Sequence, residues 1–171
     1  MTFPPPDYRF LRFWTDEYPT HQRLEIWRDV LSQMLLKVEL KALSDEPFRV
    51  EATLRALTGV RFGLGHFTPC VHSRTREIAG VDNDDLLLIV NLEGPLSIVL
   101  EGNEVVVREG DACLLSCTQT FDLLRRDPGR LLFARIERAC LAALLPNPDR
   151  FVGRVILRGN EGAVAPHDVS A

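Results

Sequence analysis

The strongest constraint on the fold is a series of short segments in which apolar and polar residues alternate, each bounded by turn residues. FRVEATLRAL, residues 48–57, is the clearest of them, because its alternation is typical of a half-buried strand. Its predicted inward residues are Phe48, Val50, Ala52 and Leu54. About seven or eight such segments occur at spacings of roughly 8–12 residues, which predicts a β-sandwich or barrel and not an alternating α/β fold.

Two helical patterns flank the strands. After Pro19 and Thr20, apolar residues recur at helical spacing, and this stripe consists of Leu24, Trp27, Leu31, Met34 and Leu35. A second helix is predicted from about residue 137 to residue 145, followed by a short strand or extended piece at 152–157. The fold class is therefore mainly β, with an N-terminal amphipathic helix and a C-terminal helix.

Composition restricts the partners and the compartment. The formal net charge is −4 and the basic residues are dispersed, so this chain offers no basic face for nucleic acid. It contains no apolar run long enough to span a membrane and begins without the apolar stretch of a signal peptide, so we expect a cytoplasmic protein with no membrane partner. The four cysteines form no C-x-x-C pair and are expected to be buried apolar side chains.

The segment GVRFGLGHF supplies the first candidate ligand contacts. Alternation places Phe62, Leu64 and His66 on one apolar face, which is expected to point inward. His66 is then either a satisfied histidine inside the barrel or at its rim, or a polar group that orients a ligand between apolar walls. We therefore take Phe62, Leu64 and His66 as candidate ligand-binding residues.

Two arginines are further candidates. Arg74 and Arg76 lie on one face of VHSRTREIAG, a segment that is predicted to be a strand ending at Gly80. If that face is outside, both side chains are solvated. If it points inward, their guanidinium groups have the geometry to hold a carboxylate with two hydrogen bonds.

Residues 1–18 are predicted to be an arm that docks on the domain. Pro4-Pro5-Pro6 excludes a helix at its start. Four large apolar residues then give the arm something to bury, namely Phe10, Leu11, Phe13 and Trp14. We expect Phe13 and Trp14 to close the barrel over a ligand, and we take Trp14 as a candidate contact.

The segment EGNEVVVREGDACLLSCTQTF, residues 101–121, resembles the second half of a cupin barrel. In cupins a Gly-Asp turn leads into a strand, and a metal-binding histidine follows shortly after. Here Phe121 stands about where that histidine would be. His66 and His72 are separated by Pro69, so their spacing does not pair them on one regular strand as metal ligands. We therefore expect neither a metal nor another cofactor.

The order of segments also resembles the N-terminal effector-binding domain of AraC-type transcriptional regulators over roughly residues 10–160. The similar segments are RLEIWRDVLSQMLLKVEL, FRVEATLRAL, VHSRTREIAGVDNDDLLLIVNLEG, EGDACLLSCTQTF and IERACLAALLPNPDRFVGRVI. The resemblance implies a cupin-like jelly roll that senses a small molecule or mediates dimerisation, while a separate domain with two helix-turn-helix motifs binds DNA. We expect an arm at 1–18, the AraC-type domain at 19–158 and a polar tail at 159–171, with the DNA-binding domain absent from this chain.

Three functions remain open on these grounds. The leading hypothesis is a non-enzymatic sensing or dimerisation domain of an AraC-type regulator, with a small-molecule effector, a homodimer as its assembly, and DNA contacts only through the absent domain. The alternative is a metal-dependent cupin enzyme, such as a dioxygenase or isomerase. The third is a pure interaction module whose barrel is filled by its own side chains.

Overall fold

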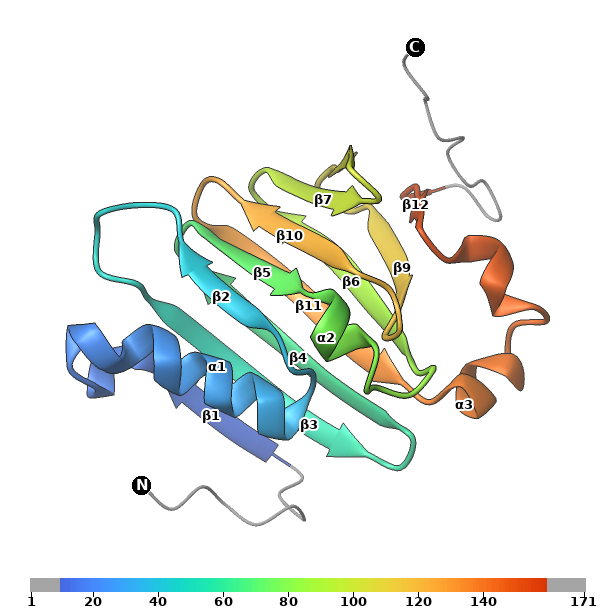
Figure 1. Cartoon of the computed structure of the whole chain (residues 1–171), viewed down its shortest axis with the longest axis horizontal. Coiled ribbons are helices and arrows are strands. Elements are labelled where there is room, and N and C mark those ends of the chain that lie inside the picture. Colours follow the sequence, from blue (N-terminus) through green and yellow to red (C-terminus); the bar gives the residue numbers. More distant parts are fainter. Residues whose placement is uncertain (1–9, 160–171) are drawn as a thin grey trace.

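The computed structural model describes residues 10–159 and shows two antiparallel sheets packed face to face (Figure 1). The seven-stranded sheet has the order β1 (Phe10–Trp14), β3 (Val50–Leu57), β4 (Val60–Phe67), β11 (Gly129–Ile136), β6 (Leu86–Glu93), β9 (Ala112–Ser116) and β12 (Arg154–Ile156). The five-stranded sheet has the order β2 (Glu39–Ala42), β5 (Cys70–Arg74), β10 (Phe121–Arg125), β7 (Leu96–Leu100) and β8 (Asn103–Val107). The helices are α1 (Arg23–Met34), α2 (Arg76–Ala79) and α3 (Arg138–Ala142), so the prediction of a mainly β fold with flanking helices is confirmed.

Strand β3 shows why the alternating pattern predicts this architecture. Val50, Ala52 and Leu54 are buried while Glu51 and Arg55 are exposed. The strand pairs with β4 in antiparallel register through a tight turn at Gly59, whose φ of 76° is accessible to glycine without steric penalty. One face of each sheet thus turns to the shared core.

Helix α1 closes the side of the sandwich between the edge strands β1 and β2 (Figure 1). It buries Ile26, Trp27, Val30 and Leu31, of which Trp27 and Leu31 belong to the predicted stripe, while Leu24 and Met34 of that stripe are half-buried. The Phe13 ring of β1 stacks on Trp27 with a centroid separation of 5.3 Å. The described part of the arm is therefore a strand that packs against α1, whereas residues 1–9 and 160–171 lie outside the described residues.

Two predicted elements differ from the structure. Strand β5 ends at Arg74 and does not continue to Gly80, because Thr75 caps helix α2 by accepting a hydrogen bond from the Ile78 amide at 3.4 Å. The second predicted helix is shorter than expected, since α3 covers only Arg138–Ala142. No helix in the described part of the chain is long and apolar enough to cross a membrane.

The face of β4 is the reverse of the predicted one. Gly63, Gly65 and Phe67 are buried, whereas Leu64 and His66 are exposed and Phe62 is half-buried. A Cβ atom at Gly63 would lie 2.4 Å from the Phe133 ring, and one at Gly65 would lie 2.7 Å from the Phe67 ring. Glycine is required at these two inward positions because aromatic rings fill the space that a larger side chain would occupy.

This inversion gives a test. We expect Gly63→Ala to lower the free energy of unfolding by about 1–3 kcal/mol, because the added methyl group overpacks the core. Leu64→Ala on the outer face should change the free energy of unfolding by less than about 1 kcal/mol, although it alters the side chain by more atoms than Gly63→Ala does. Urea unfolding of the two variants makes the comparison. A larger loss for Leu64→Ala would show that the strand face is assigned incorrectly.

Candidate functional site

A narrow apolar cavity lies between α1 and the two sheets, with a volume of about 40 Å³. Every residue that lines it is buried. Helix α1 contributes Trp27 and Leu31. The Trp27 ring centroid lies 5.8 Å from that of Phe67, which in turn lies 6.2 Å from that of Phe133. A space of this size holds about one or two water molecules.

Phe121 in β10 belongs to the wall of the same cavity and is 5% exposed. The sequence resemblance places a metal-binding histidine near this position in cupins, and here a phenyl ring extends the apolar wall. Within residues 10–159, no three His, Cys, Asp or Glu side chains gather in a way that could hold a metal ion.

Trp27 carries the most unusual polar group of the cavity wall. The residue is 0% exposed, and its Nε1–H has no hydrogen-bond acceptor among the described residues. Buried tryptophan N–H groups usually have a partner. A buried donor left without one costs about 1–3 kcal/mol, so an acceptor that reached this N–H would offset that cost.

His72 in β5 is the second polar group of the cavity wall, and it is uncharged at neutral pH. It is 8% exposed, its ring meets Phe67 edge-on at 5.7 Å, and its Nδ1 lies 3.9 Å from Cys70 Sγ. Burial, assisted by the nearby Arg125 cation, lowers the pKa of His72 to about 4. The cavity wall therefore carries no charged side chain at neutral pH.

Arg125 lies further along the same inward face of β10, beyond the cavity. Its guanidinium donates to the Glu93 carbonyl at 2.8 Å, to Asn91 Oδ1 at 3.2 Å and to the Arg130 carbonyl at 3.4 Å. No carboxylate in the described part of the chain lies within 4.0 Å of it. Burial lowers its pKa. Through these contacts, Arg125 holds together the turns at one end of the sandwich.

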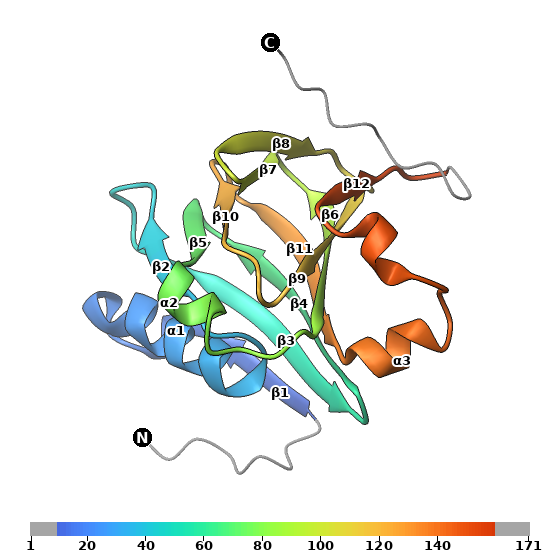
Figure 2. The same ribbon diagram turned by 45° about the vertical axis from the view of Figure 1, so that its right-hand side comes forward.

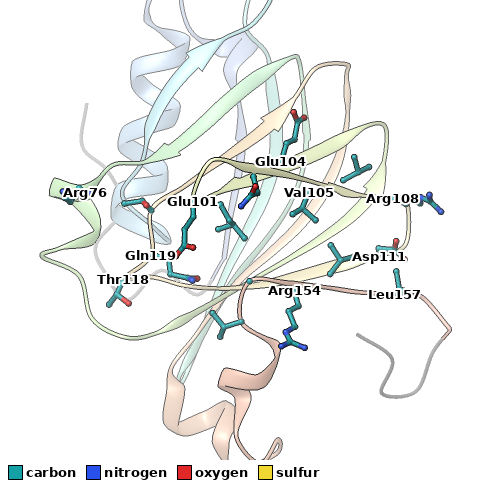
Figure 3. A pocket seen from close by; sticks show the side chains of 17 residues that line it. Arg76, Glu101, Glu104, Val105, Arg108, Asp111, Thr118, Gln119, Arg154 and Leu157 are labelled. Carbon is teal, nitrogen blue, oxygen red and sulfur yellow. The ribbon is translucent and has the colours of Figure 1, made fainter. Parts of the chain in front are cut away.

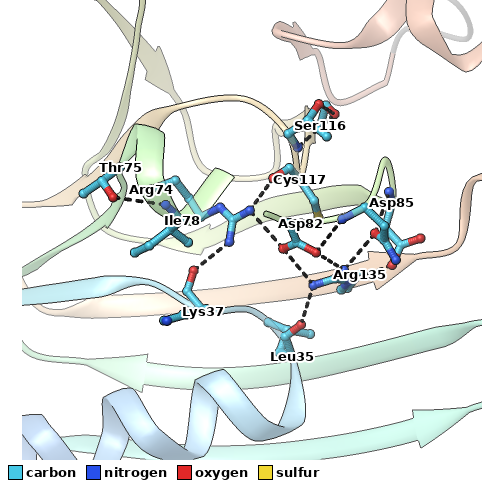
Figure 4. A network of polar contacts seen from close by, with 12 residues as sticks. Leu35, Lys37, Arg74, Thr75, Ile78, Asp82, Asp85, Ser116, Cys117 and Arg135 are labelled. Atoms are coloured by element: carbon cyan, nitrogen blue, oxygen red, sulfur yellow. Dashed lines mark hydrogen bonds and ion pairs between the residues drawn. The ribbon is translucent and has the colours of Figure 1, made fainter. Parts of the chain in front are cut away.

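A buried ion-pair network ties the end of α1 to the loop after α2 (Figure 4). Arg74, whose side chain is 0% exposed, donates to Asp82 at 3.0 Å and to the carbonyl groups of Lys37 and Cys117. Arg135 donates to Asp82 at 2.7 Å and to Asp85 at 2.8 Å. Burial alone would raise the pKa of Asp82, but the hydrogen bonds from Arg135, the Asn83 amide and Arg74 outweigh it and leave that pKa below its ordinary value.

A second hollow is a wide surface groove between the β7–β8 hairpin and β12, two segments that Figure 2 shows beside each other. Its volume is about 990 Å³, and Figure 3 shows its lining side chains. Arg76, Arg108 and Arg154 are exposed there, and among the described residues none of them has a carboxylate within 4.0 Å. The groove lies between two sheet edges and does not reach the residues that line the cavity.

The structure does not bring the six candidate contacts together. The prediction that His66, Leu64 and Phe62 point into the barrel is wrong, because they lie on the outer face of β4. Trp14 is half-buried on the side of β1 opposite to Phe13, with the Arg12 guanidinium 4.6 Å from its ring. A role of these four residues in ligand binding stays a prediction.

The two candidate arginines are separated by the start of α2. Arg74 points inward, but Asp82 and two carbonyl groups already occupy its guanidinium. Arg76 is exposed and lies at the rim of the groove. The prediction that both lie on one face of a strand is therefore wrong. The inward residues that it missed are His72 and Phe121, which alternation along 70–74 and 121–125 places on the inward faces of their own strands.

The fold and the cavity define a class of protein: a two-sheet, cupin-like β domain with an apolar interior closed by a helix. A sequence model of the family described as AraC-binding-like domain matches residues 27–165, and the chain belongs to this family. A comparison with curated proteins found no significant match.

One solved structure agrees with this class. The AraC-like transcriptional activator CuxR is 14% identical and superimposes with a TM-score of 0.63 over 78% of this chain. The match covers 49% of the CuxR chain, so this chain spans about half its length. A cupin superfamily protein from Desulfitobacterium hafniense is 14% identical over 57% of this chain and 83% of that one, with a TM-score of 0.43. At these identities the CuxR likeness shows the fold alone.

Proposed function

We propose that the chain is the effector-sensing domain of an AraC-type transcription regulator and that it acts by binding, not by catalysis. The observation that carries the proposal is the match of the AraC-binding-like family over residues 27–165. The interior supports it, because a wall of aromatic and aliphatic side chains with a few polar groups is typical of ligand sites. In this proposal the domain works in the cytoplasm as part of a homodimer, and DNA is bound by a separate domain.

A sensing domain needs a ligand that binds two arrangements of the protein with different affinity. Helix α1 is suited to be the element that changes, since it forms one wall of the cavity and its C-terminal end is held by side-chain hydrogen bonds. Arg135 donates to the Leu35 carbonyl at 3.3 Å, and Arg74 donates to the Lys37 carbonyl at 2.7 Å. A displacement of α1 would therefore shift the hydrogen-bond partners of Arg74 and Arg135 in the ion-pair network.

The proposal predicts stabilisation by an effector. In a thermal-shift panel of sugars, aromatic acids, fatty acids and small neutral organic molecules, one class should raise the unfolding temperature. A compound present at about 100 times its Kd adds about 2.7 kcal/mol, which corresponds to roughly 5–10 °C for a domain of this size. If no class gives a shift at millimolar concentration, the sensing role fails.

One observation favours a second function, that of an interaction module. The interior cavity of about 40 Å³ is already close to filled by the protein's own side chains. In that case the domain serves dimerisation alone, and light scattering would show a dimer whose stability no small molecule changes. The cupin-enzyme alternative predicts stoichiometric iron, manganese or zinc in the purified protein, and that this metal is lost in the double variant His66→Gln, His72→Gln.

A further inference from the structure

We infer that the cavity beside Trp27 binds a small, neutral and mainly apolar molecule that accepts a hydrogen bond from Trp27 Nε1–H. This inference rests on the proposed sensing function and names the site and the ligand class for it. The starting observation is the fully buried indole N–H that no acceptor within residues 10–159 meets, in a side chain that lines an apolar cavity. A ketone, aldehyde or ether oxygen supplies the acceptor that the protein does not.

The walls of the cavity indicate that the rest of the ligand is apolar. Phe67, Phe121 and Phe133 present aromatic surface, and leucine side chains line much of the remainder. A water molecule needs two to four polar partners to be held in such a space. Trp27 and His72 supply at most the lower end of that number and the rest of the lining is apolar, so a molecule with a carbon body matches more of this wall than water does.

Neutrality follows from the charges around the cavity. A carboxylate would be desolvated against phenyl rings, and no cationic side chain lines the cavity. His72 is buried and neutral, since burial lowers its pKa to about 4. Arg125 lies beyond the cavity wall and already donates to three oxygen atoms.

Because the cavity is small, ligand binding would have to displace α1. A ligand with more than a few heavy atoms exceeds about 40 Å³, so the wall must give way. The sheets are fixed by their ladders of hydrogen bonds, whereas α1 is held to them by side-chain packing and by the bonds of Arg74 and Arg135 to the segment just after it. Trp27 and Leu31 on α1, with Leu35 just after it, form the wall that can move.

The experiment uses three probes built on a five-membered ring with the whole chain, of which the first two are nearly equal in shape. Cyclopentanone carries a neutral acceptor, methylenecyclopentane lacks it, and cyclopentanecarboxylate is anionic. The chain has two tryptophans, Trp14 and Trp27, so Trp14→Phe leaves one indole N–H signal in a nitrogen-15 NMR spectrum and assigns it. We expect cyclopentanone to move the Trp27 signal downfield in a saturable manner and to bind roughly 2- to 10-fold more tightly than methylenecyclopentane.

The outcomes separate the parts of the inference. Equal affinity for the ketone and the hydrocarbon, with no downfield shift, overturns the hydrogen bond to Trp27. Preferential binding of the carboxylate overturns the neutral ligand class. The comparison between probes uses the native side chain, and Trp27→Phe, if folded, should abolish the preference for the ketone.

Failure of this inference is distinguishable from failure of the sensing function. An effector found in the thermal-shift panel that leaves the Trp27 indole signal unmoved would keep the sensing role and place the site elsewhere, with the groove lined by Arg76, Arg108 and Arg154 as the next site to test. Absence of both an effector and probe binding would overturn the two proposals together.

Discussion

Asp82→Ala is expected to lower the free energy of unfolding by about 3 kcal/mol, because it leaves the buried Arg74 cation without its carboxylate. The Arg74 side chain is 0% exposed and Asp82 is 18% exposed, so water replaces the lost charge poorly. The loss stays at the lower end of the range for broken buried pairs, since Arg74 keeps the Lys37 and Cys117 carbonyl acceptors. Urea unfolding followed by circular dichroism measures the difference.

A surface ion pair of the same type provides the control. Glu104 lies 2.6 Å from Arg126, and both side chains are about half exposed. Glu104→Ala should leave the urea midpoint nearly unchanged, because solvent screens an exposed pair. Equal losses for Asp82→Ala and Glu104→Ala would show that burial does not strengthen the Arg74–Asp82 pair.

The network around Asp82 also connects distant parts of the chain. Arg135 joins the Leu35 carbonyl after α1 to Asp82 and Asp85. Next to them, Arg138 at the start of α3 pairs with Asp84 and Asp149, each at 2.8 Å. The two groups of ion pairs meet where Asp84 and Asp85 are adjacent in the chain, so the proposed displacement of α1 would act on α3 through this backbone link.

The sequence predicts the inward face of an element correctly where its hydrophobic pattern allows one orientation only. The alternation at Val50, Ala52 and Leu54 fixes the inward face of β3, because the opposite face carries charges that cannot be buried unpaired. The stripe through Trp27 and Leu31 fixes the face of α1 in the same way. These residues establish the inward face of β3 and the part of the cavity wall that α1 supplies.

Prediction from the sequence failed where the pattern was ambiguous. In β4 the inward face carries Gly63 and Gly65, and their role depends on the Phe133 and Phe67 rings that fill the space above them. Local pattern also does not indicate the ion pair of Asp82, because its partner Arg135 lies 53 residues away in the sequence. Contacts of this range are set by the packing of the two sheets, which local periodicity does not contain.

His72 should make the domain lose stability as the pH falls from about 6.5 to about 4. Its folded-state pKa is about 4 against an ordinary value of 6.5, mainly because burial disfavours the imidazolium, with the Arg125 cation adding to the effect. The unfolded state therefore binds more protons in this interval, and the stability present above pH 6.5 declines by about 3 kcal/mol, reckoned at 1.36 kcal/mol per pKa unit. Urea unfolding at successive pH values measures the slope.

His72→Gln removes the titrating group and should flatten the slope between pH 6.5 and pH 4, whatever its effect on stability at pH 7. The lowered pKa of Asp82 acts in a different window, since the stability that it provides is lost only as the pH falls below the ordinary carboxylate range. His66→Gln changes an exposed histidine on the outer face of β4 and should keep the slope of the parent protein. A slope that survives in His72→Gln and disappears in His66→Gln would show that the titrating histidine lies outside the barrel. His72 would then not be the neutral, buried polar group of the cavity wall.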